Sequence, residues 1–240
     1  MKIIIARHAD PDYEKDSLTE AGFIEAKSLA KRLSKIEANE VYVSPLGRAK
    51  ATCREYEKIS GKRAVEKEFL KEFNHAVYDS EIGQMNQPWD FMPKYYFSHS
   101  KLRDYDGWLD SECMKSGDIK THYDKVTAEF DKLLALHGYE RDKGFYLAKR
   151  PCNDTILLFC HFGIECVLLS HLASVPSLVF SQSFCCLPTG VTTVVTEERE
   201  QGIASMRCIG FGDLSHLYAD GIEPSFSARF CEKFTDDTRH

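Results

Sequence analysis

The clearest pattern in the chain is a pair of short, continuously apolar runs at 3–6 and 156–160, each followed at once by polar residues. Because neither run alternates apolar with polar positions, both are typical of parallel strands that are buried on two faces. Arg7-His8 follows the first run and His161 follows the second. Ligands of open α/β sheets bind beyond the carboxyl ends of the strands, so we expect both histidines at one such edge.

Helical periodicity follows the first run. Thr19 is placed to cap a helix over about residues 20–35. A strand is expected at 41–44, and a second helix runs from about 47 to 60 and stops at Gly61. This alternation predicts a parallel sheet with right-handed crossovers. The apolar positions that define the first helix are Phe23, Ala26, Ala30 and Leu33.

The second half of the chain continues the pattern. Helices are expected over about 118–136 and 163–173, and β-branched residues at 191–198 and 203–210 flank a Glu-Gln-Gly turn typical of a hairpin. We therefore predict a three-layer α/β/α sandwich with a mostly parallel central sheet and a hairpin at its edge. The whole chain, 1–240, is expected to form a single domain.

The segment 75–116 has no clear period. It holds Trp89, Trp108 and a Tyr-Tyr-Phe run at 95–97 among Pro, Asp, Ser and Gly residues. We interpret it as a lid or insertion. Its aromatic side chains either line a substrate mouth or pack the insertion onto the domain.

Composition narrows the class of protein. The chain of 240 residues is 43% hydrophobic and 28% charged, and no segment approaches the roughly 18 apolar residues that span a membrane. The N-terminal apolar run is too short for a signal peptide, so a cytoplasmic protein without a membrane partner is expected. The net charge of −6 gives no positive electrostatic field that would attract nucleic acid, so no nucleic-acid partner is expected. An anionic substrate would need a local cluster of arginines. The oligomeric state is left open.

The cysteines do not indicate a metal site. Their number, nine, is odd, and Cys185 and Cys186 are adjacent. Cys160, Cys166 and Cys208 lie in apolar stretches. We therefore expect buried free thiols, and neither a zinc site nor any other metal or cofactor.

Four motifs carry the candidate chemistry: Arg7-His8, the Ser-Pro-Leu-Gly-Arg-Ala segment at 44–49, Leu-Lys-Glu at 70–72 and His-Phe-Gly at 161–163. In this order, at strand ends, they resemble the histidine phosphatase superfamily, also called phosphoglycerate mutase-like. The segments at 17–22 and 212–217 are similar to further family features, with His216 in a structural role. The resemblance covers nearly the whole chain outside the insertion.

The residue types suit phosphoryl transfer. A neutral imidazole can attack a phosphoester dianion, so His8 is the expected nucleophile. Arg7, Arg48 and His161 would bind the phosphoryl oxygens, with His161 either protonated or donating one N–H. Glu72 is the expected proton donor to the leaving oxygen, and Glu68 and Glu81 remain alternatives.

We therefore expect a metal-independent phosphomonoesterase that hydrolyses a small phosphorylated metabolite through a phosphohistidine. Two alternatives are a cofactor-dependent phosphoglycerate mutase and a noncatalytic phosphate-binding protein. The chain lacks the basic mutase segment, and Ala-Asp-Pro-Asp-Tyr-Glu at 9–14 replaces the family's Gly-x-Thr-x-x-Asn run. Retention of both His8 and Glu72 disfavours simple binding, which needs neither a nucleophile nor an acid.

Overall fold

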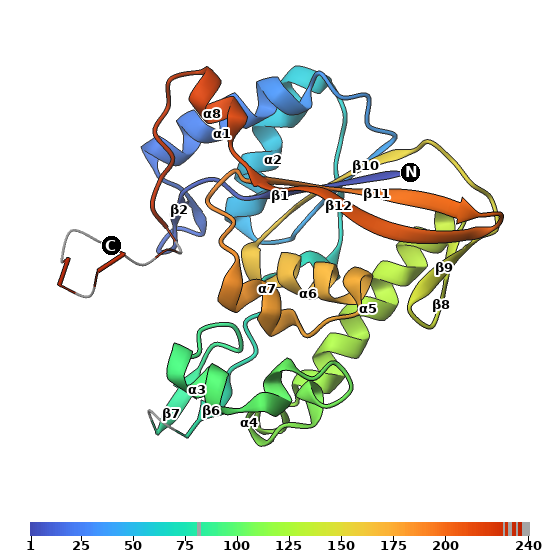
Figure 1. The fold of residues 1–240 in the computed structure, drawn as a ribbon. Helices are drawn as coiled ribbons and strands as arrows, with labels where there is room; N and C mark the ends of the chain where they lie inside the picture. Colours follow the sequence, from blue (N-terminus) through green and yellow to red (C-terminus); the bar gives the residue numbers. More distant parts are fainter. Residues whose placement is uncertain (81–82, 228, 230–231, 234, 237–240) are drawn as a thin grey trace.

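The computed structural model describes residues 1–80, 83–227, 229, 232–233 and 235–236 (Figure 1). Its centre is an eight-stranded sheet with the order β5-β4-β10-β1-β11-β12-β9-β8. The first four of these strands are parallel, and each later strand is antiparallel to its neighbour. In this order the strands are β5 (Val65–Glu66), β4 (Glu40–Val43), β10 (Thr155–Cys160), β1 (Lys2–Arg7), β11 (Val191–Glu200), β12 (Ile203–Asp213), β9 (Phe145–Ala148) and β8 (Tyr139–Asp142).

The predicted α/β fold is confirmed, but the sheet is mixed rather than mostly parallel, and the β11–β12 hairpin is not at its edge. β11 pairs with β1, and β12 pairs with β9 through Ile203 and Ala204. A second hairpin, β8–β9, extends the sheet beyond β12. β8 has the sequence Tyr-Glu-Arg-Asp and carries no apolar run, so this second hairpin was not predicted from the sequence.

Helices cover both faces of the sheet (Figure 1). α1 (Glu20–Leu33) and α2 (Gly47–Ser60) pack on one face, and α5 (Ile119–Leu136), α6 (Phe162–Ala173) and α7 (Ser177–Ser183) lie on the other. Successive residues of a strand point to opposite faces. Ile4 therefore joins the core beneath α1 and α2, whereas Ile3 and Ile5 join the core that includes α5 and α6.

Local signals set the ends of these helices. Thr19 caps α1, its Oγ1 accepting a hydrogen bond from the Gly22 N–H at 2.9 Å. Gly61 ends α2 in a left-handed conformation at φ +70°. Of the four apolar positions with helical spacing, Ala26, Ala30 and Leu33 are buried, whereas Phe23 is 36% exposed. Gly22 approaches the Asp10 carbonyl so closely that a Cβ would lie 2.2 Å from it.

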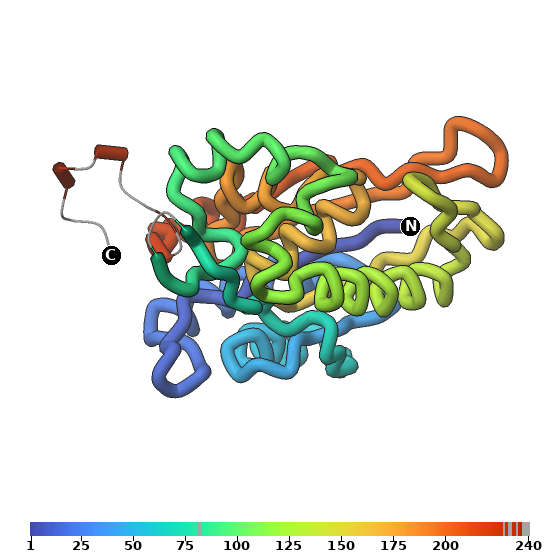
Figure 2. The backbone as a smooth tube through the Cα atoms, turned by 90° about the horizontal axis from the view of Figure 1, so that it is seen from below, coloured from blue at the N-terminus to red at the C-terminus, as the bar shows by residue number. Residues whose placement is uncertain are grey.

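The insertion consists of short elements placed on the α6 side of the sheet (Figure 2). Trp108 is 1% exposed and meets Tyr123 of α5 edge to face, with ring centroids 5.3 Å apart. Phe97 is exposed, in contrast to the two tyrosines before it. The elements are β6 (Val77–Asp79), β7 (Gln84–Asn86), α3 (Pro93–Ser98), two 3₁₀ turns (Ser100–Arg103 and Trp108–Asp110) and α4 (Glu112–Ser116).

Smaller elements complete the described chain. β2 (Pro11–Asp12) pairs with β3 (Ser17–Leu18), and a 3₁₀ turn spans Glu68–Leu70. α8 (Ser215–Ala219) is bound to α1 through the Ser28 hydroxyl, which donates to the His216 carbonyl at 3.0 Å. None of the helices in the described ranges has the length and apolar content to cross a membrane.

The cysteine prediction is partly wrong. Cys208 is exposed because much of β12 beyond its short pairing with β9 faces solvent, and Cys185 is exposed as well. Cys152 is half-buried, and Cys231 lies outside the described residues. The buried free thiols are Cys53, Cys113, Cys160, Cys166 and Cys186.

Candidate active site

The two predicted histidines meet at the carboxyl ends of adjacent strands. β1 and β10 pair in register to their last residues, Arg7 opposite Cys160. The His8 N–H then donates to the Cys160 carbonyl at 3.0 Å. As a result the rings of His8 and His161 lie 5.0 Å apart between centroids, inclined by 58°. Both side chains are buried.

The hydrogen bonds of His8 define which ring nitrogen is free to react. Nδ1 lies 2.8 Å from the Ala9 carbonyl, which can only accept, so Nδ1 carries the ring proton. Nε2 therefore keeps its lone pair, which faces the Nε–H of Arg48 at 3.4 Å. Burial, then Arg7 and His161, hold the pKa of His8 well below its usual range. The imidazole is neutral, as nucleophilic attack requires.

Arg48 lies in the first turn of α2 and is held by Asp16. The Asp16 carboxylate accepts from the Arg48 guanidinium at 2.9 Å and from the Gly47 N–H at 2.6 Å. Gly47 is needed for this approach, since a Cβ there would lie 2.0 Å from the Asp16 carbonyl. Asp16 adopts φ +44°, and no sequence motif signals its role. The Arg48 guanidinium also lies 5.4 Å from the centroid of the Tyr13 ring.

Arg7 is buried at the end of β1, with part of its guanidinium uncommitted. Nη1 donates to the Cys186 carbonyl at 2.6 Å and lies 3.5 Å from the Ser227 carbonyl. Nε has no partner among the described residues. A buried donor without a partner is costly, and a bound anion would satisfy it.

Ser44, at the end of β4, positions His161. Its hydroxyl lies 2.8 Å from the His161 Nε2 and accepts from the Leu46 N–H at 3.3 Å. This pattern favours a hydroxyl proton donated to Nε2, which leaves the ring proton on Nδ1. Within the described residues Nδ1 has no partner. Burial, followed by Arg48 and Arg7, lowers the pKa of His161 to about 2, so the ring is neutral in the free protein and the protonated alternative is disfavoured.

Glu72 lies against the first turn of α6. Its Oε1 accepts from the Phe73 N–H at 2.8 Å and from the Ile164 N–H at 3.0 Å. A Cβ at Gly163 would lie 2.6 Å from Oε1 and 2.9 Å from the Trp89 ring, so only glycine allows this contact. Burial raises the pKa of Glu72 despite these hydrogen bonds. The raised pKa favours the protonated form that a general acid needs.

The alternatives to Glu72 are less well placed. Glu68 is exposed and forms an ion pair with Lys71 at 2.8 Å. Glu81 lies outside the described residues. His216 is bound to Thr189 at 3.1 Å and packs beneath α1, a contact that fits a structural role.

Glu165 is a buried carboxyl that the motif search did not single out. It is 0% exposed, and neither carboxyl oxygen has a hydrogen-bond partner within the described ranges. Burial raises its pKa to about 7, although Thr192, Cys186 and Arg7 partly oppose the shift. Its signal was visible in the sequence: one carboxylate within the otherwise apolar first two turns of α6.

Comparison with known proteins agrees with this geometry. The family model of the histidine phosphatase superfamily, branch 1, matches residues 3–116. The resemblance to this superfamily that the sequence motifs indicated is confirmed. Phosphoserine phosphatase 1 of Hydrogenobacter thermophilus is 24% identical over 217 residues, covering 86% of this chain and 92% of that protein.

Solved structures show the same fold. Entamoeba histolytica phosphoserine phosphatase in complex with phosphoserine is 21% identical, with a TM-score of 0.59 over 90% of this chain and 98% of that one. A mycobacterial glucosyl-3-phosphoglycerate phosphatase is 16% identical, with a TM-score of 0.54 over 86% of this chain and 96% of that one. At these identities the likeness concerns the fold, and the side-chain roles rest on the geometry of this protein.

Proposed function

We propose that this protein hydrolyses small phosphomonoesters through a phosphohistidine formed on His8, without using a metal ion. The observation that carries the proposal is the arrangement of His8: its Nδ1 proton is bound to the Ala9 carbonyl, so Nε2 presents a lone pair between buried cationic and polar groups. A noncatalytic phosphate-binding site would have no need for a neutral imidazole held in this tautomer.

In the first half-reaction, Nε2 of His8 forms a bond to phosphorus as the ester P–O bond breaks. The phosphoryl group spreads its negative charge over three equatorial oxygens, and fixed positive donors stabilise that charge. Arg7, Arg48 and the Nδ1–H of His161 supply these donors. The guanidinium of Arg48 already faces His8, so it needs little reorganisation to contact an oxygen of the transferred group.

Glu72 acts on the other side of phosphorus. Its protonated carboxyl gives a proton to the leaving alkoxide, and the resulting carboxylate takes a proton from water in the second half-reaction. Water then displaces His8 and releases inorganic phosphate. Half-burial of Glu72 and its raised pKa both support this role.

For the substrate we propose a small phosphorylated metabolite that also carries a carboxylate. The named activities of the relatives support this choice: two are phosphoserine phosphatases, and a third acts on glucosyl-3-phosphoglycerate. Phosphoserine and 3-phosphoglycerate are therefore the first compounds to test. Phosphate released to water distinguishes a phosphatase from a mutase, which returns it to another hydroxyl of the sugar acid.

The test combines a substrate panel with trapping of the intermediate. Turnover of phosphomonoesters should persist in EDTA, and rapid acid-free quenching should leave a base-stable, acid-labile label on His8. His8→Ala should lose activity by on the order of 10⁴-fold or more, because it removes the nucleophile. His99→Ala, an exposed histidine in the insertion, should keep wild-type activity and labelling. Product formation without label on His8 would refute the proposal.

A further inference from the structure

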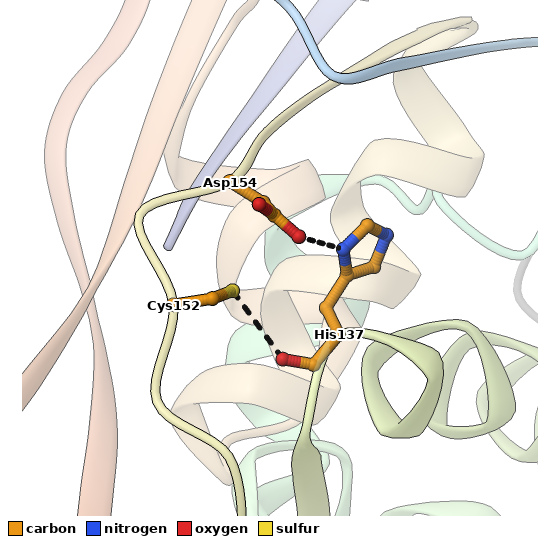
Figure 3. Close-up of side chains that lie close together, drawn as sticks. All are labelled: His137, Cys152 and Asp154. Atoms are coloured by element: carbon orange, nitrogen blue, oxygen red, sulfur yellow. Dashed lines mark hydrogen bonds and ion pairs between the residues drawn. The ribbon is translucent and has the colours of Figure 1, made fainter.

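A second cluster of reactive side chains lies at the other end of β10 (Figure 3). In the described part of the chain, His137, Cys152 and Asp154 form one group whose ligand atoms all lie within 4.8 Å of one another. Six residues of β10 separate this group from His161, so it is roughly 20 Å from the catalytic cluster at about 3.3 Å per residue. The proposed phosphatase mechanism does not use it.

We propose that His137, Cys152 and Asp154 form a binding site for one zinc-like divalent cation. Thiolate, imidazole and carboxylate together are the ligands of zinc, whereas magnesium and calcium prefer oxygen alone. A water molecule would complete a tetrahedral site. The sequence analysis expected no metal site, because the two later ligands follow the histidine by 15 and 17 residues and match no compact zinc spacing.

The ligands are held on backbone that is already fixed. His137 ends α5, and Cys152 and Asp154 belong to the segment that leads into β10. Gly138 at φ +88° lets the two segments touch, since a Cβ there would lie 2.3 Å from the Arg150 carbonyl. Arg150 in turn donates its N–H to the Gly138 carbonyl at 3.2 Å. The site therefore needs little ordering when an ion binds.

The present contacts of the three ligands can be exchanged for metal bonds. Nδ1 of His137 lies 2.8 Å from Asp154, and the Cys152 thiol makes a weak contact with the His137 carbonyl at 3.3 Å. Ligand atoms around tetrahedral zinc lie roughly 3–4 Å apart, given bonds of about 2.0–2.3 Å. Opening the His137–Asp154 contact by a few tenths of an ångström would admit the ion.

Glu40 provides the outer carboxylate that such a site requires. His137 is 5% exposed, and its Nε2 has no hydrogen-bond partner in the described residues. The Glu40 carboxylate lies 3.6 Å from this nitrogen. When Nδ1 binds the cation, the ring proton moves to Nε2, where Glu40 can accept it. The Cys152 thiol gives its proton to solvent as it becomes a thiolate ligand.

The site is also accessible. Cys152 lines an open cavity of about 560 Å³ that Tyr139, Asn153 and Glu198 also line. Of the three ligands Cys152 alone lines this cavity, and the Asp154 side chain is itself 33% exposed, so the thiol and the carboxylate are open to an ion and a water ligand. A bound ion would tie the end of α5 to the start of β10, so its expected effect is on stability rather than on the chemistry at His8.

The test uses Co²⁺ as a spectroscopic substitute for zinc on the full chain. A His8→Gln background removes cation binding at the catalytic imidazole. Co²⁺ should saturate at one ion per chain with thiolate-to-cobalt charge-transfer absorption. Zn²⁺ should displace it and raise the melting temperature. Cys152→Ser should abolish the absorption band, whereas the matched control Cys208→Ser, which removes an exposed thiol, should retain it.

A substitution outside the ligand set covers the case in which a ligand variant folds poorly. Glu40→Gln should weaken zinc affinity roughly tenfold, as loss of an outer hydrogen-bonding partner does. A wild-type chain without the charge-transfer band, or a band that survives in Cys152→Ser, would overturn the site. In a chain that keeps His8, Cys152→Ser should have the phosphatase activity of the wild type. The test of the metal site is therefore separate from the test of the proposed function.

Discussion

The catalytic edge of the sheet and the 75–116 insertion are held in place by different forces. At the catalytic edge, Arg7, His8 and His161 follow two hydrogen-bonded strands whose register runs to their last residues. The insertion instead consists of short elements fixed by buried aromatic side chains such as Trp108. Groups placed by strands are positioned more precisely than groups placed by loops, so the insertion is the part that can vary in shape.

This difference suggests that the two regions have different roles. In the proposed mechanism the strand ends supply the phosphoryl chemistry, which is the same for every phosphomonoester. The insertion meets that site through Trp89, whose ring lies beside Gly163 and Glu72. It is therefore the part of the molecule that can select the ester group. Substitutions at the two regions should have different signatures, and the following measurements would separate them.

Glu72→Gln should give the largest selective effect at the catalytic edge. The amide cannot protonate a leaving alkoxide, so kcat/KM for alkyl phosphates should fall by about 10²–10⁴-fold. p-Nitrophenyl phosphate should lose much less, because nitrophenolate leaves without a proton. Equal losses on the two substrates would assign Glu72 to positioning. Glu68→Gln, at an exposed ion pair, is the matched control and should change neither rate.

Arg48→Ala should lower kcat/KM by about 10²–10³-fold on every substrate, because it removes one preorganised donor from the developing charge. Arg48→Lys should restore only part of the loss, since a point charge cannot replace a planar fork. Asp16→Asn should cause a smaller loss, since it weakens only the contact that orients Arg48. Wild-type kcat/KM in Arg48→Ala would show that Arg48 does not contact the transferred phosphoryl group.

Features that depend on neighbouring residues could be predicted from the sequence, whereas features that depend on distant partners could not. Continuous apolar runs placed β1 and β10 correctly, and Thr19 and Gly61 marked helix ends, because each signal is local in the chain. Asp16 and Ser44 could not be assigned, since their partners Arg48 and His161 are distant in sequence.

Other features of the fold were predicted wrongly or incompletely. Phe23 faces solvent although it shares the helical spacing of the buried Ala26, Ala30 and Leu33. The hairpin β11–β12 lies inside the sheet because β8–β9 extends it. For the aromatic residues of the insertion, the sequence left two roles open; the structure shows Trp108 packed in the core, and the half-buried Trp89 is the candidate for the substrate mouth.

The two tryptophans test whether the insertion has two functions. Trp108→Ala removes a core side chain and should cost about 3–5 kcal/mol, which at roughly 2–4 °C per kcal/mol lowers the melting temperature by about 6–20 °C. Its substrate ranking should stay that of the wild type. Trp89→Ala, at a half-buried position beside Gly163, should reorder kcat/KM among phosphomonoesters with a smaller change in melting temperature. If both variants rank the substrates by kcat/KM as the wild type does, the insertion has a structural role only.

Glu165→Gln should have the smallest effect and one that depends on pH. The pKa of Glu165 is raised to about 7 by burial, whereas the unfolded chain titrates near the ordinary value of 4.5. Between these values the folded protein binds more protons than the unfolded one, so its stability falls as pH rises and levels off above about pH 7. The neutral amide escapes this loss.

The free energy of unfolding of Glu165→Gln, compared with wild type, should therefore rise between pH 5 and pH 8, by on the order of 3 kcal/mol at most. Urea unfolding of both chains at the two pH values measures this difference, and contributions from His8 and His161 cancel between them. A difference that is the same at both pH values would show that Glu165 is not protonated in the folded protein. It would then be a buried carboxylate paired with Arg7, and the catalytic edge would hold one more fixed charge than the geometry indicates.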